Sequence, residues 1–140
     1  MTKRIGFMLG SLRKEAFTRK VAAQLAELFP EEFEIVFPEI GHLVMYNQDY
    51  DDNNETPESW TKFREEVKGL DGVVFVTPEY NRSVPPVLKN ALDIASRPYG
   101  ANAWNDKPGA IVSVSPGAVS GFGANHHLRQ VLTFLNIHAM

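Results

Sequence analysis

The segment best able to do chemistry follows a short apolar run at residues 73–76. After Thr77 come, in order, a fixed ring, a carboxylate, a phenol, an amide and a guanidinium: Pro78, Glu79, Tyr80, Asn81 and Arg82. Proline lacks an N–H group and has a nearly constant φ angle, so this loop is rigid. A rigid loop can direct backbone N–H groups at a heteroaromatic ring, with Tyr80 beside it. The alternative is an ordinary turn before a helix that Ser83 caps.

A second polar segment, residues 10–20, reads GSLRKEAFTRK and suits a phosphate. Ser11 and Thr18 offer hydroxyl groups, and Arg13 offers a guanidinium group. Free N–H groups at a helix start near Phe17 and Thr18 also favour an anion. The alternative is that Thr18 only caps the helix and that Arg13 is solvated. The segment is neither a G-x-G-x-x-G motif nor a Walker A loop, which disfavours dinucleotide and ATP sites of those kinds.

A third segment, residues 115–123, contains three glycines. Glycine lets the backbone approach a flat ligand closely, and Ser115 and Gly117 are the candidates for that contact. The alternative is a flexible loop, and for this segment taken alone it is the favoured interpretation.

We expect the remaining polar residues to have structural roles. The chain has no cysteine, which excludes disulfides, a thiolate nucleophile and a thiolate metal site. His126 and His127 are adjacent, whereas metal ligands on one helix face are spaced i, i+4. Asp49, Asp51 and Asp52 do not match the calcium-loop spacing, and we expect them in a solvated loop. We therefore predict no metal and assign no catalytic acid, base or nucleophile.

Alternating strands and helices would bring the three polar segments together. The expected strands are residues 4–10, 33–37, 72–77 and 107–115, and the expected helices are residues 18–29, 56–70, 85–96 and 123–135. A long polar loop occupies residues 38–56. The alternation predicts one α/β domain over residues 1–140, a doubly wound parallel sheet between two helical layers. Ligands of such sheets lie beyond the carboxyl ends of the strands, where the three segments are.

Composition narrows the classes of partner. The 140 residues carry a net charge of −3, which argues against non-specific binding of nucleic acid. No apolar run has the length needed to span a bilayer, so no membrane partner is expected. The absence of cysteine is compatible with a cytoplasmic protein.

At these segments the chain resembles the NAD(P)H-dependent FMN reductase family, which has a flavodoxin-like fold and includes quinone, chromate and azo-dye reductases. The matching stretches are GSLRK at residues 10–14, PEYNRSVPPVLKNALD at residues 78–93, and SPG followed by GFGANHHLRQVL at residues 121–132. The resemblance implies that FMN is bound and that NADPH or NADH passes a hydride to it. A quinone or another small acceptor then receives the electrons.

The resemblance also assigns residues to parts of FMN. Those implied at the phosphate are Ser11, Arg13, Phe17 and Thr18. Those implied along the isoalloxazine ring are Pro78, Glu79, Tyr80 and Asn81, with Arg82 nearby, and on its other edge Ser115 and Gly117. Family members often have serine at Ala16 and asparagine at Thr18, so we expect FMN binding to be weaker by on the order of 1 kcal/mol. Only residues 136–140 follow the last helix, so we expect the fifth strand and final helix to be incomplete.

The resemblance further implies a homodimer or homotetramer paired through the helix at residues 85–96. Packing in the core explains Leu88, Leu92 and Ile94 of that helix equally well. Two other functions stay open: a flavodoxin-type electron carrier with little direct NAD(P)H oxidation, and a flavodoxin-like binding protein that has lost FMN. The sequence leaves the choice between NADH and NADPH open.

Overall fold

The computed structural model describes residues 2–140 and confirms the predicted parallel sheet. The strands are β1 Lys3–Leu9, β2 Phe33–Val36, β3 Gly72–Thr77, β4 Pro108–Ser113 and β5 His138–Ala139. Within the described residues they form one sheet in the order β2-β1-β3-β4-β5, and all neighbours are parallel. The strand order reverses between β1 and β3, which is where a doubly wound sheet opens a crevice for a ligand.

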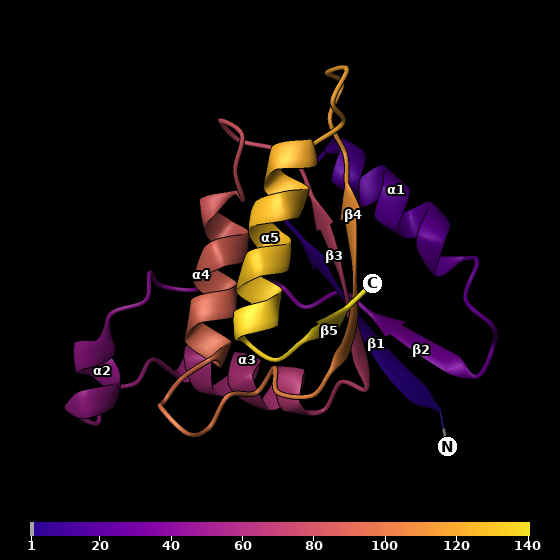
Figure 1. Cartoon of the computed structure of the whole chain (residues 1–140). Coiled ribbons are helices and arrows are strands. Elements are labelled where there is room, and N and C mark those ends of the chain that lie inside the picture. Colours follow the sequence, from indigo (N-terminus) through magenta and orange to yellow (C-terminus); the bar gives the residue numbers. More distant parts are fainter. Residues whose placement is uncertain (1) are drawn as a thin grey trace.

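The helices lie on both faces of the sheet (Figure 1). They are α1 Phe17–Ala26, α2 Gln48–Asp52, α3 Glu58–Lys68, α4 Pro86–Ala95 and α5 Phe122–Phe134. One core joins α3, α4 and α5 to the sheet through residues such as Trp60, Leu88 and Leu128. A second core joins α1 to the other face, where Ala22 packs against Phe7. The four predicted helices are confirmed, with ends that differ by three residues or fewer.

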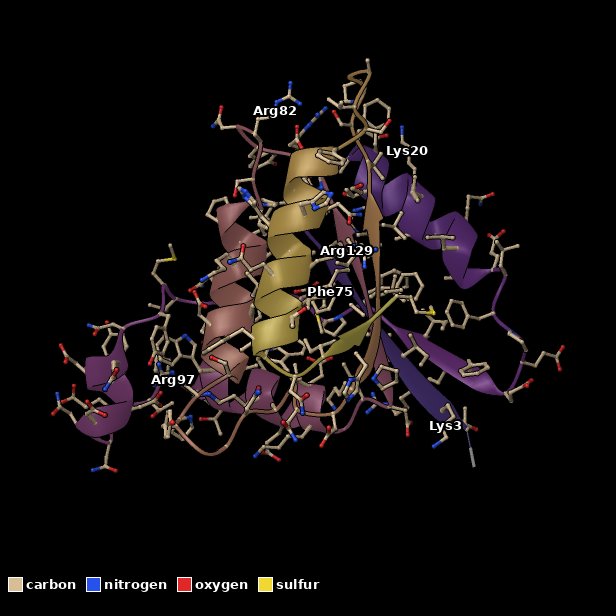
Figure 2. All side chains as sticks on the ribbon, viewed as in Figure 1. Lys3, Lys20, Phe75, Arg82, Arg97 and Arg129 are labelled. Carbon is tan, nitrogen blue, oxygen red and sulfur yellow. The ribbon has the colours of Figure 1, made fainter. Side chains whose placement is uncertain are left out.

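Strand β3 is the centre of the molecule, and all of its residues are buried. Its run of valine and phenylalanine suits a strand that is covered on both faces. Phe75, labelled near the middle of Figure 2, is fully buried, and its ring centroid lies 5.9 Å from that of Trp104. The α4 residues Leu88, Leu92 and Ile94 are also fully buried, which confirms core packing as their role. Any contact of α4 with another subunit must therefore use other side chains.

The predicted loop at residues 38–56 is wrong in part, because it contains α2. Asn47 begins this helix by accepting a hydrogen bond from the Asp49 N–H group at 3.1 Å. Asp51 is not solvated as expected, since its side chain is 9% exposed and binds Arg64 at 2.7 and 2.8 Å. Arg64 also donates to the Ile94 carbonyl at 2.9 Å. The acidic composition of residues 49–52 suggested a solvated loop. The positive charge that neutralises Asp51 comes from Arg64 of α3, so the composition of the segment alone did not indicate that Asp51 is buried.

The last described residues add one short strand to the edge of the sheet. Residues 136–140, expected to be extended, include β5, which pairs with Pro108 and Gly109 of β4.

None of the helices within residues 2–140 has both the length and the apolar character that crossing a bilayer requires.

Candidate functional site

The loops after β1, β3 and β4 meet at the carboxyl end of the sheet, next to the point where the strand order reverses. In Figure 2 this is the upper edge, where Arg82 is labelled, and Lys3 marks the opposite end. A cavity of about 180 Å³ lies among the three loops. Its lining includes eight of the predicted site residues: Ser11, Arg13, Phe17, Thr18, Pro78, Glu79, Tyr80 and Ser115. The structure adds Ala16, Val114 and Pro116 and leaves Asn81, Arg82 and Gly117 outside this lining.

The start of α1 presents unpaired donors to the cavity. Ala16 is the N-cap, and its methyl side chain cannot accept the first N–H groups of the helix. Thr18 is 1% exposed, and its Oγ1 is the one buried side-chain oxygen or nitrogen in residues 2–140 that has no hydrogen-bond partner. The alternative role of Thr18 as a helix cap is therefore wrong. Its hydroxyl group is free to bind a ligand.

Close packing between the first two loops depends on Gly10. A Cβ atom at this position would lie 2.8 Å from Pro78 Cδ and 3.1 Å from Pro85 Cγ. The Gly10 N–H group donates to the Val76 carbonyl at 2.9 Å, which extends the pairing of β1 and β3 up to the cavity. The absence of a side chain thus lets the two loops form adjacent walls.

Residues 80–83 form a two-residue hairpin. The N–H groups of Tyr80 and Ser83 donate to each other's carbonyls at 3.1 and 3.0 Å. Asn81 and Arg82 between them have φ angles of 51° and 64°, the left-handed values that a type I′ turn requires. The following helix has Pro85 as its N-cap, so the alternative in which Ser83 caps it is wrong. The backbone pairing of Tyr80 and Ser83 therefore adds to the rigidity that the prolines give this loop.

Two side chains of this loop bind α5, a connection that sequence analysis missed. Glu79 Oε2 accepts a hydrogen bond from the Ala124 N–H group at 3.0 Å, and its Oε1 accepts one from Arg82 Nη1 at 3.0 Å. The Ala124 bond, with help from Arg82, holds the pKa of the Glu79 carboxyl below its usual range. Ser83 Oγ lies 2.9 Å from Nδ1 of His127. No spacing rule predicts contacts between residues more than 40 positions apart.

The chemistry of the cavity fits FMN. An orphan hydroxyl, unpaired helix N–H groups and the Arg13 guanidinium suit the phosphate, and the Tyr80 loop suits a flat ring. Among residues 2–140 no group of three or more His, Asp or Glu side chains is placed to hold a metal ion. A larger hollow of about 970 Å³ lies along α4 and α5 and shares no residue with this lining. The smaller cavity is the better candidate for a cofactor site, because it has the unpaired donors.

Comparisons with known proteins identify the relatives of this chain. The family model "NADPH-dependent FMN reductase" matches residues 3–140. A quinone reductase of Pseudomonas putida is 54% identical over 136 residues, which are 97% of this chain and 73% of that protein. A 2-hydroxy-1,4-benzoquinone reductase of a Burkholderia species is 46% identical over 140 residues, covering 100% of this chain and 75% of that protein. The flavoenzyme NAD(P)H:(acceptor) oxidoreductase FerB of Paracoccus denitrificans has a TM-score of 0.93 at 37% identity, covering 99% of this chain and 75% of FerB.

These matches include all three loops of the cavity. The likeness to FerB confirms the flavodoxin-like fold that the sequence predicted. The chain is an oxidoreductase that binds FMN and takes electrons from NAD(P)H. It belongs to the NADPH-dependent FMN reductase family.

Proposed function

We propose that this oxidoreductase passes electrons from NAD(P)H to quinones or similar small acceptors. The observation that carries the proposal is the cavity beyond the sheet, in which a buried hydroxyl group without a partner lies at an uncapped helix start. Relatives named quinone reductase, at 54% identity, and 2-hydroxy-1,4-benzoquinone reductase, at 46% identity, support the class of acceptor.

The first loop would hold the FMN phosphate. Thr18 Oγ1 would donate a hydrogen bond to a phosphate oxygen and gain the partner that it lacks. Ser11 lines the same cavity, and its Oγ accepts a long bond of 3.4 Å from the Arg13 N–H group. The Arg13 guanidinium and the N–H groups near Phe17 would add positive potential. Charge and hydrogen bonds then favour the same anion.

The second and third loops would line the isoalloxazine ring. Tyr80 would lie beside the ring, and the backbone near Asn81 would direct N–H groups toward it. Across the cavity, the Gly117 N–H group donates to Ser115 Oγ at 3.2 Å, which orders the start of the third loop. The flavin supplies the redox chemistry when bound, by accepting a hydride and passing electrons on. The chain supplies position and electrostatics, so no acid, base or nucleophile is assigned.

A visible absorption spectrum of the purified protein, with FMN added if the protein is colourless, tests this function. We expect flavin bands that bleach when NADPH is added without oxygen and that return when a quinone is added. Bands that persist with NADPH would contradict the reductase and indicate an electron carrier. Failure to bind FMN would contradict the cofactor site itself.

We further propose that two copies of the chain pair through the face formed by α4 and α5. This face contains the larger hollow, and two of its aromatic side chains, Tyr99 and Phe134, are 93% and 89% exposed. A second copy would remove both from water. Light scattering should then show an oligomer that Phe134→Glu dissociates, while Leu28→Glu, at an exposed site on another surface, leaves it intact. A wild-type monomer would contradict the pairing, and a measured mass separates dimer from tetramer.

Two expectations about the chain as a whole stay predictions. One is a single FMN-binding domain over residues 1–140, which limited proteolysis tests by the survival of the intact chain. The other is a cytoplasmic location, which cell fractionation tests. A stable smaller fragment, or recovery in another compartment, would contradict them.

A further inference from the structure

We propose that Glu79 and the Ser83–His127 pair are positioning residues that dock the hairpin at residues 80–83 on the first turns of α5. Tyr80 of the hairpin belongs to the wall proposed for the isoalloxazine ring, so this inference rests on the proposed function and deepens it. None of the described residues of α5 lines the cavity, and the helix would act on the cofactor only through the hairpin.

The first contact is between Glu79 and the amino end of α5. Its carboxylate is 8% exposed and accepts the Ala124 N–H group at 3.0 Å. Gly121, the N-cap of α5, has no side chain that could accept an N–H group, so Glu79 takes the place of a cap from another part of the chain. A negative charge at a helix amino end is also favoured by the helix dipole. The loop and α5 therefore satisfy each other's polar groups.

The second contact lies one helical turn further along α5. Ser83 Oγ and His127 Nδ1 are 2.9 Å apart, within hydrogen-bond distance for either direction of donation. His127 follows Ala124 by three positions, so both contacts lie on the same face of the helix. The paired backbones of Tyr80 and Ser83 join the two contact points into one unit. The hairpin is therefore held near both of its ends.

The packing at Gly123 supports docking independently of these polar contacts. A Cβ atom at Gly123 would lie 2.5 Å from the Arg82 carbonyl oxygen and 3.0 Å from Glu79 Oε2. The backbone of the hairpin thus rests directly on the helix, with no room for a methyl group. An alanine here would favour the helix by its propensity and yet push the hairpin away.

Docking matters for FMN because a binding loop that is already in position loses less entropy when the ligand binds. Without the two contacts, the Tyr80–Ser83 hairpin would sample positions in which Tyr80 no longer lines the cavity. We expect the FMN dissociation constant to rise about tenfold when Glu79 is removed, which corresponds to a hairpin that is in position in about one tenth of the apoprotein molecules.

The test compares Glu79→Ala, His127→Ala and Gly123→Ala with two matched controls. Glu34→Ala removes a carboxylate of β2 that pairs with Arg4 of β1 at 3.2 Å, and neither residue lines the cavity. His126→Ala removes the neighbouring imidazole, which packs on Phe122 instead of the hairpin. Glu79→Gln is a rescue variant, because it keeps an acceptor oxygen for the Ala124 N–H group.

Three measurements are made on each variant: amide hydrogen exchange in the apoprotein at residues 80–83 and 123–124, the FMN dissociation constant by flavin fluorescence, and the urea midpoint. The three docking variants should exchange faster at those amides and bind FMN more weakly. The controls should match the wild type, and Glu79→Gln should recover most of the FMN affinity. Gly123→Ala forces a methyl group against the Arg82 carbonyl and is also expected to lower the urea midpoint, so its decisive readout is whether the faster exchange is concentrated at residues 80–83 and 123–124.

The outcomes separate this inference from the proposed function. Unchanged exchange at residues 80–83 and 123–124 in Glu79→Ala and His127→Ala would overturn the docking, whether or not FMN binds. Faster exchange with an unchanged FMN dissociation constant would overturn its positioning role. A wild-type protein that does not take up FMN would overturn the proposed function, and the exchange rates in the apoprotein would still decide the docking.

Discussion

Among single residues, Thr18 is the most informative, because its hydroxyl group is buried and has no partner in the folded chain. A buried polar group without a hydrogen bond destabilises a protein, and such groups in native structures call for an explanation. A bound phosphate provides one. The same position was only a candidate in the sequence, where a helix cap explained it equally well.

Replacing Thr18 with valine should therefore change stability and FMN binding in opposite directions. Valine has the same shape, and removing the unpaired hydroxyl should stabilise the apoprotein by about 1 kcal/mol. FMN binding should weaken about tenfold, because a bond to a charged oxygen is lost. Urea unfolding and a fluorescence titration measure the two effects. Thr18→Ser keeps the hydroxyl and serves as the control, and equal FMN affinity in Thr18→Val would contradict this role.

Asn81 allows the backbone and the side chain of the hairpin to be tested separately. Its φ of 51° is tolerated by asparagine and glycine, whereas alanine there should lower stability by about 1 kcal/mol. Asn81→Gly should keep the turn and remove the side chain. If only the backbone matters, stopped-flow reduction by NADPH will be unchanged in Asn81→Gly and slower in Asn81→Ala. Slower reduction in both variants would instead assign a role to the amide side chain.

At the scale of elements, the Asp51–Arg64 pair attaches the short helix α2 to the rest of the fold. Arg64 lies on α3 and also donates to the Ile94 carbonyl of α4, so one guanidinium joins three helices. Thr56 adds a hydrogen bond to Asp51 at 2.8 Å. A helix of five residues is too short to be stable alone, and this network explains why the polar segment is ordered.

Because of this network, the free energy of unfolding should depend on pH in the acidic range. The Arg64 hydrogen bond lowers the Asp51 pKa from its ordinary value of 3.8, so the stabilising contribution is complete above that pH. It is lost as the pH falls through the lower folded-state pKa. Asp51→Asn should therefore cost on the order of 2 kcal/mol at neutral pH and progressively less below pH 3.8.

Urea unfolding between neutral pH and pH 2.5 measures this difference. Asp52→Asn is the matched control, because the neighbouring carboxylate only accepts a bond from Gln48 on the same helix. A difference between wild type and Asp51→Asn that does not shrink in acid would contradict the role of ionised Asp51.

At the scale of the whole molecule, the cavity joins loops from β1, β3 and β4, so one ligand should stabilise the entire fold. FMN at about 100 times its dissociation constant should add about 2.7 kcal/mol, or roughly 8 °C in Tm. Riboflavin at the same concentration lacks the phosphate and should stabilise much less. Scanning calorimetry with each ligand measures the difference. Equal shifts would contradict a phosphate site at the start of α1.

Local patterns predicted most of the fold and much of the site. The apolar run of β3 can only be buried, and the alternation of strands and helices permits few arrangements other than a doubly wound sheet. That architecture places the ends of β1, β3 and β4 together, so eight of the eleven candidate residues were found around one cavity. Their grouping followed from topology, while their assignment to FMN came from a resemblance.

Only the tertiary structure decided the contacts between distant segments. Hydrogen bonding from Glu79 to α5, burial of Asp51 beside Arg64 and the missing partner of Thr18 depend on side chains that the chain brings together from afar. The sequence by itself determined the strands, the helices and the ligand edge, because these depend on local periodicity and propensity. It could not determine which polar groups are satisfied, because hydrogen bonding depends on distances that exist only after folding.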